Sequence, residues 1–270
     1  MRRVRAGFII GLGCWFGVGI AHAGRPLVID DADPADPGQG EVEAGVGYVQ
    51  ESECKHWDFP FGLSYGVIPT VEVGVGFGLQ RERRTEMREE LGGEECVGEE
   101  GVGDLGVGAK WQFLGESTWC PRQALAPSVK FPTADEDEGL GSGETDYDVT
   151  WIASKAVTDA VGIHVNIGYT WIGSPQGEDG DDVVHYGVAL DGQIQKQIQG
   201  VGEFSADREA FDGAKTFWAA NAGLRWAVTD TLTVDGAIGT GLNEDTPDFT
   251  ATIGVTWAWD LTGKNSNGEM

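Results

Sequence analysis

Residues 248–260 alternate strictly between apolar side chains and small or polar ones. The odd positions are Phe249, Ala251, Ile253, Val255, Trp257 and Trp259, and the even positions are Asp248, Thr250, Thr252, Gly254, Thr256, Ala258 and Asp260. Successive side chains of a β-strand point to opposite faces. One face of this segment is therefore apolar and ends in two indoles, while the other is small and polar. This pattern is typical of a strand in a transmembrane β-barrel, with lipid outside and a polar lumen inside.

The same alternation predicts twelve strands along the chain. They span residues 40–50, 56–67, 70–80, 101–114, 123–132, 145–157, 160–172, 182–194, 198–208, 215–228, 231–239 and 248–260. The connections between them alternate between tight turns and longer polar loops, as in outer-membrane barrels whose two chain ends lie in the periplasm. A soluble β-sandwich with tryptophans in its core would not need alternating loop lengths. We therefore expect an all-β fold, a 12-stranded antiparallel transmembrane β-barrel of the outer-membrane type.

The first residues predict a secretory signal peptide. Three arginines are followed by an apolar stretch from Gly7 to Ile20, and Ala21-His22-Ala23 fits the A-x-A cleavage rule. The apolar stretch is too short and too rich in glycine for a membrane-spanning helix. Cleavage after Ala23 would send the chain to the envelope of a Gram-negative bacterium, and the strands would place it in the outer membrane. The expected organisation is a signal peptide 1–23, a periplasmic lead-in 24–39 able to enter the lumen in part, a barrel 40–260 and a C-terminal tail 261–270.

The charge of the chain excludes one class of partner. Without its three leading arginines the chain holds 15 basic and 44 acidic residues, a net charge of −29. Such a chain is unsuited to nucleic acid or to an anionic membrane surface. The expected partners are outer-membrane lipid, lipopolysaccharide and a small-molecule solute, and the oligomeric state stays open.

No motif predicts a cofactor or a metal site. Residues 101–106 match G-x-G-x-x-G, but the strand pattern continues through Val107, Ala109 and Trp111, so no phosphate-binding helix follows. The acidic run 135–138 lacks the spacing of a calcium loop. We expect no cofactor and no bound metal.

The positions that face inward in this phasing are the candidate lining of a solute path. They are Glu41, Glu43, Glu72, Asp104, Lys110, Lys130, Asp146, Asp148, His164, Asn166, His185, Asp191, Glu203, Asp207, Arg225 and Asp235. Ten acids against three bases favour cations if the lumen holds water. The alternative is that these groups pair with one another and fill a closed interior, because lone buried charges are costly. Both interpretations remain open, since twelve strands lie between the small filled barrels and the sixteen-stranded porins.

Two other sets of residues were considered for chemistry. Ser154, His164 and Asn166 lie on adjacent predicted strands, the one combination suited to an acyl hydrolase. They face the lumen rather than the bilayer, so we expect no enzyme. Cys54 and Cys96 fall in predicted external loops and form a candidate disulfide, which leaves Cys120 unpaired in a periplasmic turn.

Several short blocks resemble a proteobacterial outer-membrane transporter family that is labelled as phenol meta-pathway degradation proteins. The blocks are Arg25 to Asp31, Pro37 to Glu43, Gly103 to Trp111, Phe131 to Thr133, Gly139 to Gly143, Asn166 to Tyr169, and Gly202 with Glu203. The chain departs from the family pattern at Ile29, where threonine is expected, and at Ala134, where glycine is usual. The resemblance implies an outer-membrane barrel connected with uptake or export of small compounds, aromatic or apolar ones among them.

The sequence therefore predicts a channel or transporter that passes small solutes across the outer membrane. The alternative is a closed structural or adhesion barrel that acts through the external loops 81–100 and 133–144. A barrel acyl hydrolase is the third and least favoured class.

Overall fold

The computed structural model describes residues 24–51, 54–88, 93–136, 138, 140–173, 182–210, 215–244 and 246–261, with the side chains of 81–99 left out. Within these ranges the chain forms thirteen β-strands. They are β1 (Gln39–Glu51), β2 (Cys54–Ile68), β3 (Val71–Arg88), β4 (Gly93–Val102), β5 (Leu105–Leu114), β6 (Arg122–Phe131), β7 (Asp146–Thr158), β8 (Val161–Trp171), β9 (Val183–Gln195), β10 (Ile198–Glu209), β11 (Thr216–Ala227), β12 (Leu232–Gly241) and β13 (Phe249–Asp260). No helix in the described part of the chain is long and apolar enough to cross a bilayer.

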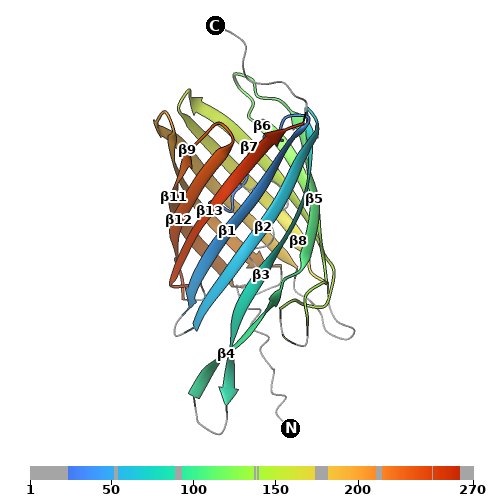
Figure 1. The fold of residues 1–270 in the computed structure, drawn as a ribbon, viewed down its shortest axis with the longest axis vertical. Helices are drawn as coiled ribbons and strands as arrows, with labels where there is room; N and C mark the ends of the chain where they lie inside the picture. Colours follow the sequence, from blue (N-terminus) through green and yellow to red (C-terminus); the bar gives the residue numbers. More distant parts are fainter. Residues whose placement is uncertain are drawn as a thin grey trace.

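The strands close into a barrel because β1 pairs with both β2 and β13, all antiparallel. Figure 1 shows this seam, with the first strand in blue beside the last in red. The thirteen strands occupy twelve positions, since β4 and β5 both pair with β3. The prediction of a 12-stranded antiparallel barrel is confirmed.

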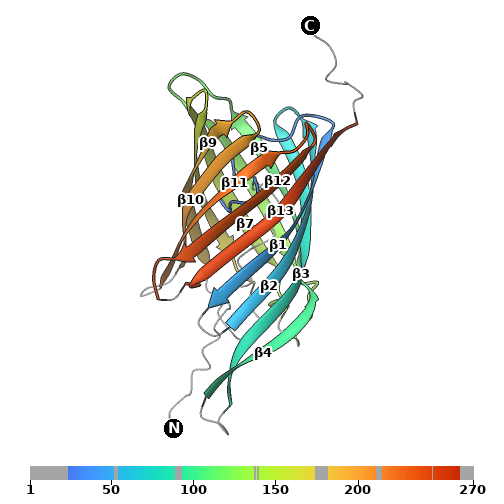
Figure 2. The ribbon, with the colours of Figure 1, turned by 60° about the vertical axis from the view of Figure 1, so that its left-hand side comes forward.

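The region between residues 81 and 100 differs from the prediction of a loop. β3 runs on to Arg88, and its last ten residues pair with β4 in a hairpin. In Figure 2 this hairpin extends beyond the rest of the barrel. Outside the membrane both faces of a hairpin meet water, so no apolar alternation is required and the strand signal is lost. The expected strand 101–114 is also interrupted at Gly103 and Asp104, where Gly103 N–H donates to Gly78 O at 2.8 Å.

Most connections follow the predicted phasing. Two to four residues join β2 to β3, β7 to β8, β9 to β10 and β11 to β12, and seven join β5 to β6. At the other end six to fourteen residues join β6 to β7, β8 to β9, β10 to β11 and β12 to β13, but only two join β1 to β2. The end of β13 lies at the end with the short links, at the top of Figure 1. By the rule for outer-membrane barrels, this end is periplasmic and the β3–β4 hairpin projects on the external side.

The outer wall is apolar along its length. Large exposed apolar side chains point outward from every barrel strand except β1, among them Leu63, Val73, Val107, Ile167, Leu190, Leu224, Ile253 and Trp257. Aromatic pairs lie at both ends of the wall, with ring centroids 5.5 Å apart for Trp257 and Trp259 and 4.9 Å apart for Tyr169 and Trp171. Indole and phenol rings favour the boundary between lipid and water, as two membrane interfaces require.

Two clusters of buried apolar residues lie inside the barrel and join the wall to residues 24–38, which we call the plug segment. One cluster joins Leu27 and Ile29 of this segment to Ala189 and Val201 of the wall. A second cluster joins Ala32 to Ala124, Ala126 and Ile152. The plug segment therefore lies across the lumen and provides two of the four residues of the first cluster and one of the four of the second.

Candidate functional site

Glu203 of β10 binds the plug segment through its backbone. Its Oε2 accepts from the N–H groups of Val28 and Ile29, both at 2.8 Å. Its Oε1 accepts from Val28 N–H at 3.1 Å and from Asn221 Nδ2 at 2.7 Å. The carboxylate is buried, and hydrogen bonds to a charged acceptor are stronger than neutral ones. Because Glu203 binds backbone N–H groups, it holds the middle of the plug segment regardless of which side chains the segment carries.

Lys110 of β5 makes the second anchor. It is fully buried, and its Nζ lies 2.9 Å from Asp30 Oδ1 and 3.5 Å from Asp33 O. Its neighbour on the same face, Gln112, donates from Nε2 to Ala32 O at 3.1 Å. A buried ammonium is tolerated only when it is paired and hydrogen-bonded. The plug segment thus supplies the counter-charge that Lys110 needs.

Further inward side chains bind plug backbone groups. Glu72 Oε2 accepts from Ala35 N–H at 2.7 Å. The Asn166 amide, in the orientation that satisfies both of its ends, accepts from Asp30 N–H at 2.8 Å and donates to Asp30 O at 2.9 Å. In these contacts the wall side chains bind backbone N–H and C=O groups of the plug segment, as the backbone of a neighbouring strand would.

Ser154, His164 and Asp191 form a hydrogen-bonded chain across β7, β8 and β9. Ser154 Oγ lies 2.9 Å from His164 Nδ1, and His164 Nε2 lies 3.3 Å from Asp191 Oδ1. The order of groups is that of a hydrolase triad, but Ser154 is buried and its Oγ accepts from Ala32 N–H at 2.9 Å. Ser154 therefore contacts the plug segment at the position where a substrate would have to sit. Asn166, the third member of the combination drawn from the sequence, binds Asp30 instead.

Arg25 fastens the start of the plug segment to the barrel seam. Its Nη2 donates to Thr252 Oγ1 at 3.0 Å, and its Nε lies 3.4 Å from Asp235 Oδ2. The guanidinium lies over Gly45 and Gly254, which are partners across β1 and β13, and a Cβ at either position would collide with it. Glycine at both positions therefore leaves room for the Arg25 guanidinium.

The external half of the lumen holds a separate group of predicted lining residues. Lys130 Nζ lies 2.6 Å from Asp146 Oδ2 and 3.2 Å from Asp104 Oδ2. His185 Nε2 lies 2.8 Å from Asp148 Oδ2, and Asp207 is the register partner of His185 on β10. These charges bind one another across neighbouring strands rather than the plug segment. At the periplasmic end of the barrel, Glu43 Oε1 accepts from Thr256 at 3.4 Å and Glu41 Oε1 accepts from Gln39 at 3.5 Å.

The periplasmic rim carries an ion-pair network that sequence reasoning missed. Glu116, in the link between β5 and β6, accepts from Arg122 and from Lys155, each at 2.8 Å. These hydrogen bonds, first from Arg122 and then from Lys155, lower the pKa of Glu116 to about 2. Arg122 also pairs with Asp33 of the plug segment. The sequence does offer one signal for this network, because Arg122 stands at an inward-facing position of the strand alternation, two residues before the buried Ala124.

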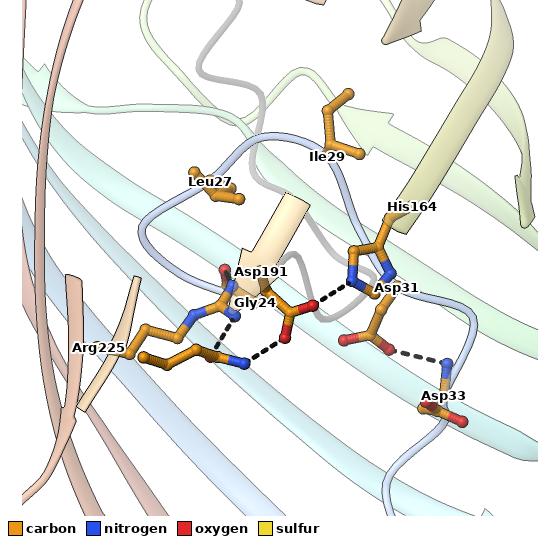
Figure 3. Close-up of a pocket in the computed structure, with 9 residues that line it drawn as sticks. Gly24, Leu27, Ile29, Asp31, Asp33, His164, Asp191 and Arg225 are labelled. Atoms are coloured by element: carbon orange, nitrogen blue, oxygen red, sulfur yellow. Dashed lines mark hydrogen bonds and ion pairs between the residues drawn. The ribbon is translucent and has the colours of Figure 1, made fainter. Parts of the chain in front are cut away.

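A cavity of about 190 Å³ remains between the plug segment and the wall. Figure 3 shows the residues that line it, His164, Asp191 and Arg225 from the wall and Gly24, Leu27, Ile29, Asp31 and Asp33 from the plug segment. Arg225 Nε donates to Arg25 O at 2.5 Å, Nη1 donates to Gln199 Oε1 at 3.0 Å, and Nη2 donates to Gly24 O. The cavity is therefore mostly polar and lies near the periplasmic end of β8, β9 and β11.

Cys54 and Cys120 differ in their covalent state. Cys54 is disulfide-bonded, and it begins β2 rather than lying in a loop. Cys96 falls within β4, and its side chain is outside the described residues, so its pairing with Cys54 stays a prediction. Cys120 is exposed and free, as expected. Among the described residues there is no group of three or more His, Cys, Asp or Glu side chains that could hold a metal ion.

A closed antiparallel barrel of twelve positions, apolar outside and polar inside, defines this protein as an outer-membrane β-barrel with the fold of porins and channels. The chain belongs to the family described as "Putative MetA-pathway of phenol degradation", whose model matches residues 23–259. No protein with a curated description matches it.

Three solved structures share this fold at low sequence identity. The COG4313 outer membrane channel from Pseudomonas putida F1 is 16% identical, with a TM-score of 0.60, over 86% of this chain and 100% of that one. The NanC porin is 12% identical, with a TM-score of 0.59, over 80% of this chain and 98% of that one. The KdgM porin in complex with disordered oligogalacturonate is 8% identical, with a TM-score of 0.53, over 81% of this chain and 99% of that one.

Proposed function

We propose that this protein passes small solutes across the outer membrane, aromatic or apolar compounds among them, when the plug segment moves away from the lumen wall. The observation that carries this proposal is the way in which the plug segment is held. Its described ties to the wall are hydrogen bonds, ion pairs and two small apolar clusters, all of which can form and break reversibly. A segment held in this way can close a channel without sealing it permanently.

The lumen wall supports a mixed chemistry for the solute. Ala124, Ala126 and Ile152 provide an apolar surface beneath the plug segment, and Ala189 and Val201 provide a second one. The external half carries Asp146, Asp148 and Asp207, so the first side chains that a solute meets are largely acidic. We infer that a cation with an apolar body passes more readily than an anion of the same shape.

The names of similar proteins agree with this proposal. The COG4313 protein is named an outer membrane channel, and the family description refers to phenol degradation. The likeness in structure shows the fold alone, so the solute class for this chain rests on its own lumen. We further propose that lipid and lipopolysaccharide cover its apolar outer wall, and that the sixteen inward residues named from the sequence line the solute path.

Liposome swelling with a matched pair of solutes tests this function. Benzyltrimethylammonium and benzenesulfonate share a benzene ring and carry opposite permanent charges. We expect the cation to enter vesicles that contain the protein faster than it enters empty vesicles. In the vesicles with protein, the cation should also enter faster than the anion. A sugar and an amino acid of similar size complete the panel.

The same assay includes a variant with a loosened plug segment, Glu203→Gln. If neither the intact protein nor this variant speeds the entry of any solute, the protein is a closed barrel and the proposal fails. Equal entry of the cation and the anion would remove the charge preference and leave the channel.

One observation favours the second candidate, a structural or adhesion barrel. The β3–β4 hairpin extends beyond the barrel on the external side, where it could meet a partner. Removal of residues 82–99 with a short turn in their place separates the two functions. A channel keeps its solute entry after this deletion, whereas an adhesion protein loses cell-surface binding.

A further inference from the structure

The cavity beside Arg225 contains Gly24, the residue that directly follows the predicted cleavage site. Gly24 lines this cavity together with Asp31, Asp33, His164 and Asp191. Cleavage after Ala23 would turn the Gly24 nitrogen from an amide into an α-ammonium group. The first charge of the processed chain is therefore created at the wall of a cavity that already exists.

The charges around the cavity are mainly negative. Asp31 and Asp33 face it from the plug segment and Asp191 faces it from β9, with His164 on β8. Arg225 is the one arginine among the residues that line it, and its three described hydrogen bonds go to the oxygens of Gly24, Arg25 and Gln199. Asp33 pairs with Arg122, while Asp191 accepts from Gln199 Nε2 and lies 3.3 Å from His164 Nε2. A cation beside Asp191 would be stabilised further, because a carboxylate in a partly enclosed site gains from a paired positive charge.

The position of Gly24 is fixed by the wall. Arg225 Nη2 donates to its carbonyl oxygen, as Figure 3 shows, and Asp191 lines the same cavity. A Cβ at this position would lie 2.8 Å from Arg225 Nη2, so glycine allows the close approach. Since the α-nitrogen is two bonds from the pinned carbonyl carbon, it cannot leave the neighbourhood of the cavity while this hydrogen bond is kept.

We propose that this cavity is the binding site of the mature N-terminus, in which Asp191 binds the α-ammonium group of Gly24. Cleavage of the signal peptide then has a second effect, because it creates the α-ammonium group that adds an ion pair between the plug segment and the wall. The precursor lacks this cation. The inference concerns the processed N-terminus and stands or falls independently of solute passage.

The test measures the pKa of the α-amino group in the intact processed protein. The amines are labelled by reductive ¹³C-methylation in detergent, and the N-terminal resonance is followed by NMR as the pH is changed. An opposite charge within hydrogen-bonding distance raises the pKa of an amine, so we expect a value about 1 to 3 units above the ordinary 7.7 to 8.0. Mass spectrometry of the same sample must give Gly24 as the first residue.

Two variants locate the effect. Asp191→Asn should lower the N-terminal pKa by about 1 unit or more, whereas the matched change Asp148→Asn, in the external half, should leave it unchanged. Insertion of two glycines after Ala23 keeps every wall side chain and moves the α-nitrogen by up to about 7 Å. It should return the pKa to the ordinary range even if Asp191→Asn folds poorly.

An ordinary pKa in the intact protein would overturn the proposal, and so would a pKa that neither Asp191→Asn nor the insertion changes. A first residue other than Gly24 would overturn it as well. A protein that passes these tests and yet admits no solute would refute the proposed function alone.

Discussion

The substitution Glu203→Gln tests the hold of the barrel on its plug segment most directly. The carboxylate accepts the N–H groups of Val28 and Ile29 on Oε2, and it accepts from Asn221 on Oε1. Glutamine keeps one oxygen in place of two, removes the charge, and brings an NH₂ group that cannot accept. Whichever way its amide turns, NH₂ faces an N–H donor.

The magnitude follows from these contacts. A hydrogen bond to a charged group contributes about 1.5–3 kcal/mol, and an unsatisfied buried donor costs about 1–3 kcal/mol. We expect Glu203→Gln to weaken the seated state of the plug segment by about 2–4 kcal/mol. At about 1.4 kcal/mol for each factor of ten, the ratio of open to closed channels should rise by roughly 30- to 700-fold.

Single-channel recording in planar bilayers measures this ratio as the fraction of time spent open. Asp207→Asn is the matched control, because Asp207 faces inward from the same strand and no hydrogen bond or ion pair joins it to the described plug residues. The folded state of each protein is checked by the shift between unheated and boiled gel samples. If Glu203→Gln is folded and opens no more often than the intact protein or the control, our account of the closed state is wrong.

Three further predictions concern stability and covalent structure. Lys110→Met removes the ammonium group that pairs with the buried carboxylate of Asp30 and should destabilise the folded protein by about 3–5 kcal/mol. This loss should lower the temperature at which the gel shift disappears. The control Lys196→Met, in an exposed turn, should leave that temperature unchanged. The pKa of Glu116 is about 2, below its ordinary 4.5, so its ion pairs stabilise the folded state fully above about pH 4.5 and are lost progressively as the pH falls towards 2. Glu116→Gln should therefore lower the gel-shift temperature at pH 7 but not at pH 2. An equal difference at both pH values would contradict this. If Cys54 pairs with Cys96, thiol titration of the processed, unfolded chain should find one free thiol before reduction and three after it, and three before reduction would exclude the pairing.

The barrel was predictable because lipid on one side and a polar lumen on the other impose a period of two on every strand. Leu63, Val107 and Ile253 are exposed on the outer wall, and the residues next to each of them in the chain point the other way. The hairpin of β3 and β4 escaped prediction because water surrounds it. The alternation that identifies a strand comes from the membrane, so it ends where the membrane ends.

The plug segment was less predictable for a different reason. Glu203, Glu72 and Asn166 bind its backbone, and every residue other than proline offers the same N–H and C=O groups. A sequence can mark these side chains as inward, but it cannot tell whether they face water or peptide. Only the charged residues of the segment, Arg25, Asp30 and Asp33, indicate from the sequence that it pairs with charged groups of the wall.

The partners of the plug segment have a consequence for how the protein is made. Lys110, Ser154 and Glu203 are 80, 122 and 174 residues further along the chain than the groups they bind, and Asp235 is 210 residues beyond Arg25. These side chains surround a common axis only when the first and last strands have joined. The stretch of mature chain that is translated first must therefore be the last to settle, and biogenesis passes through a completed ring whose bore is still unfilled.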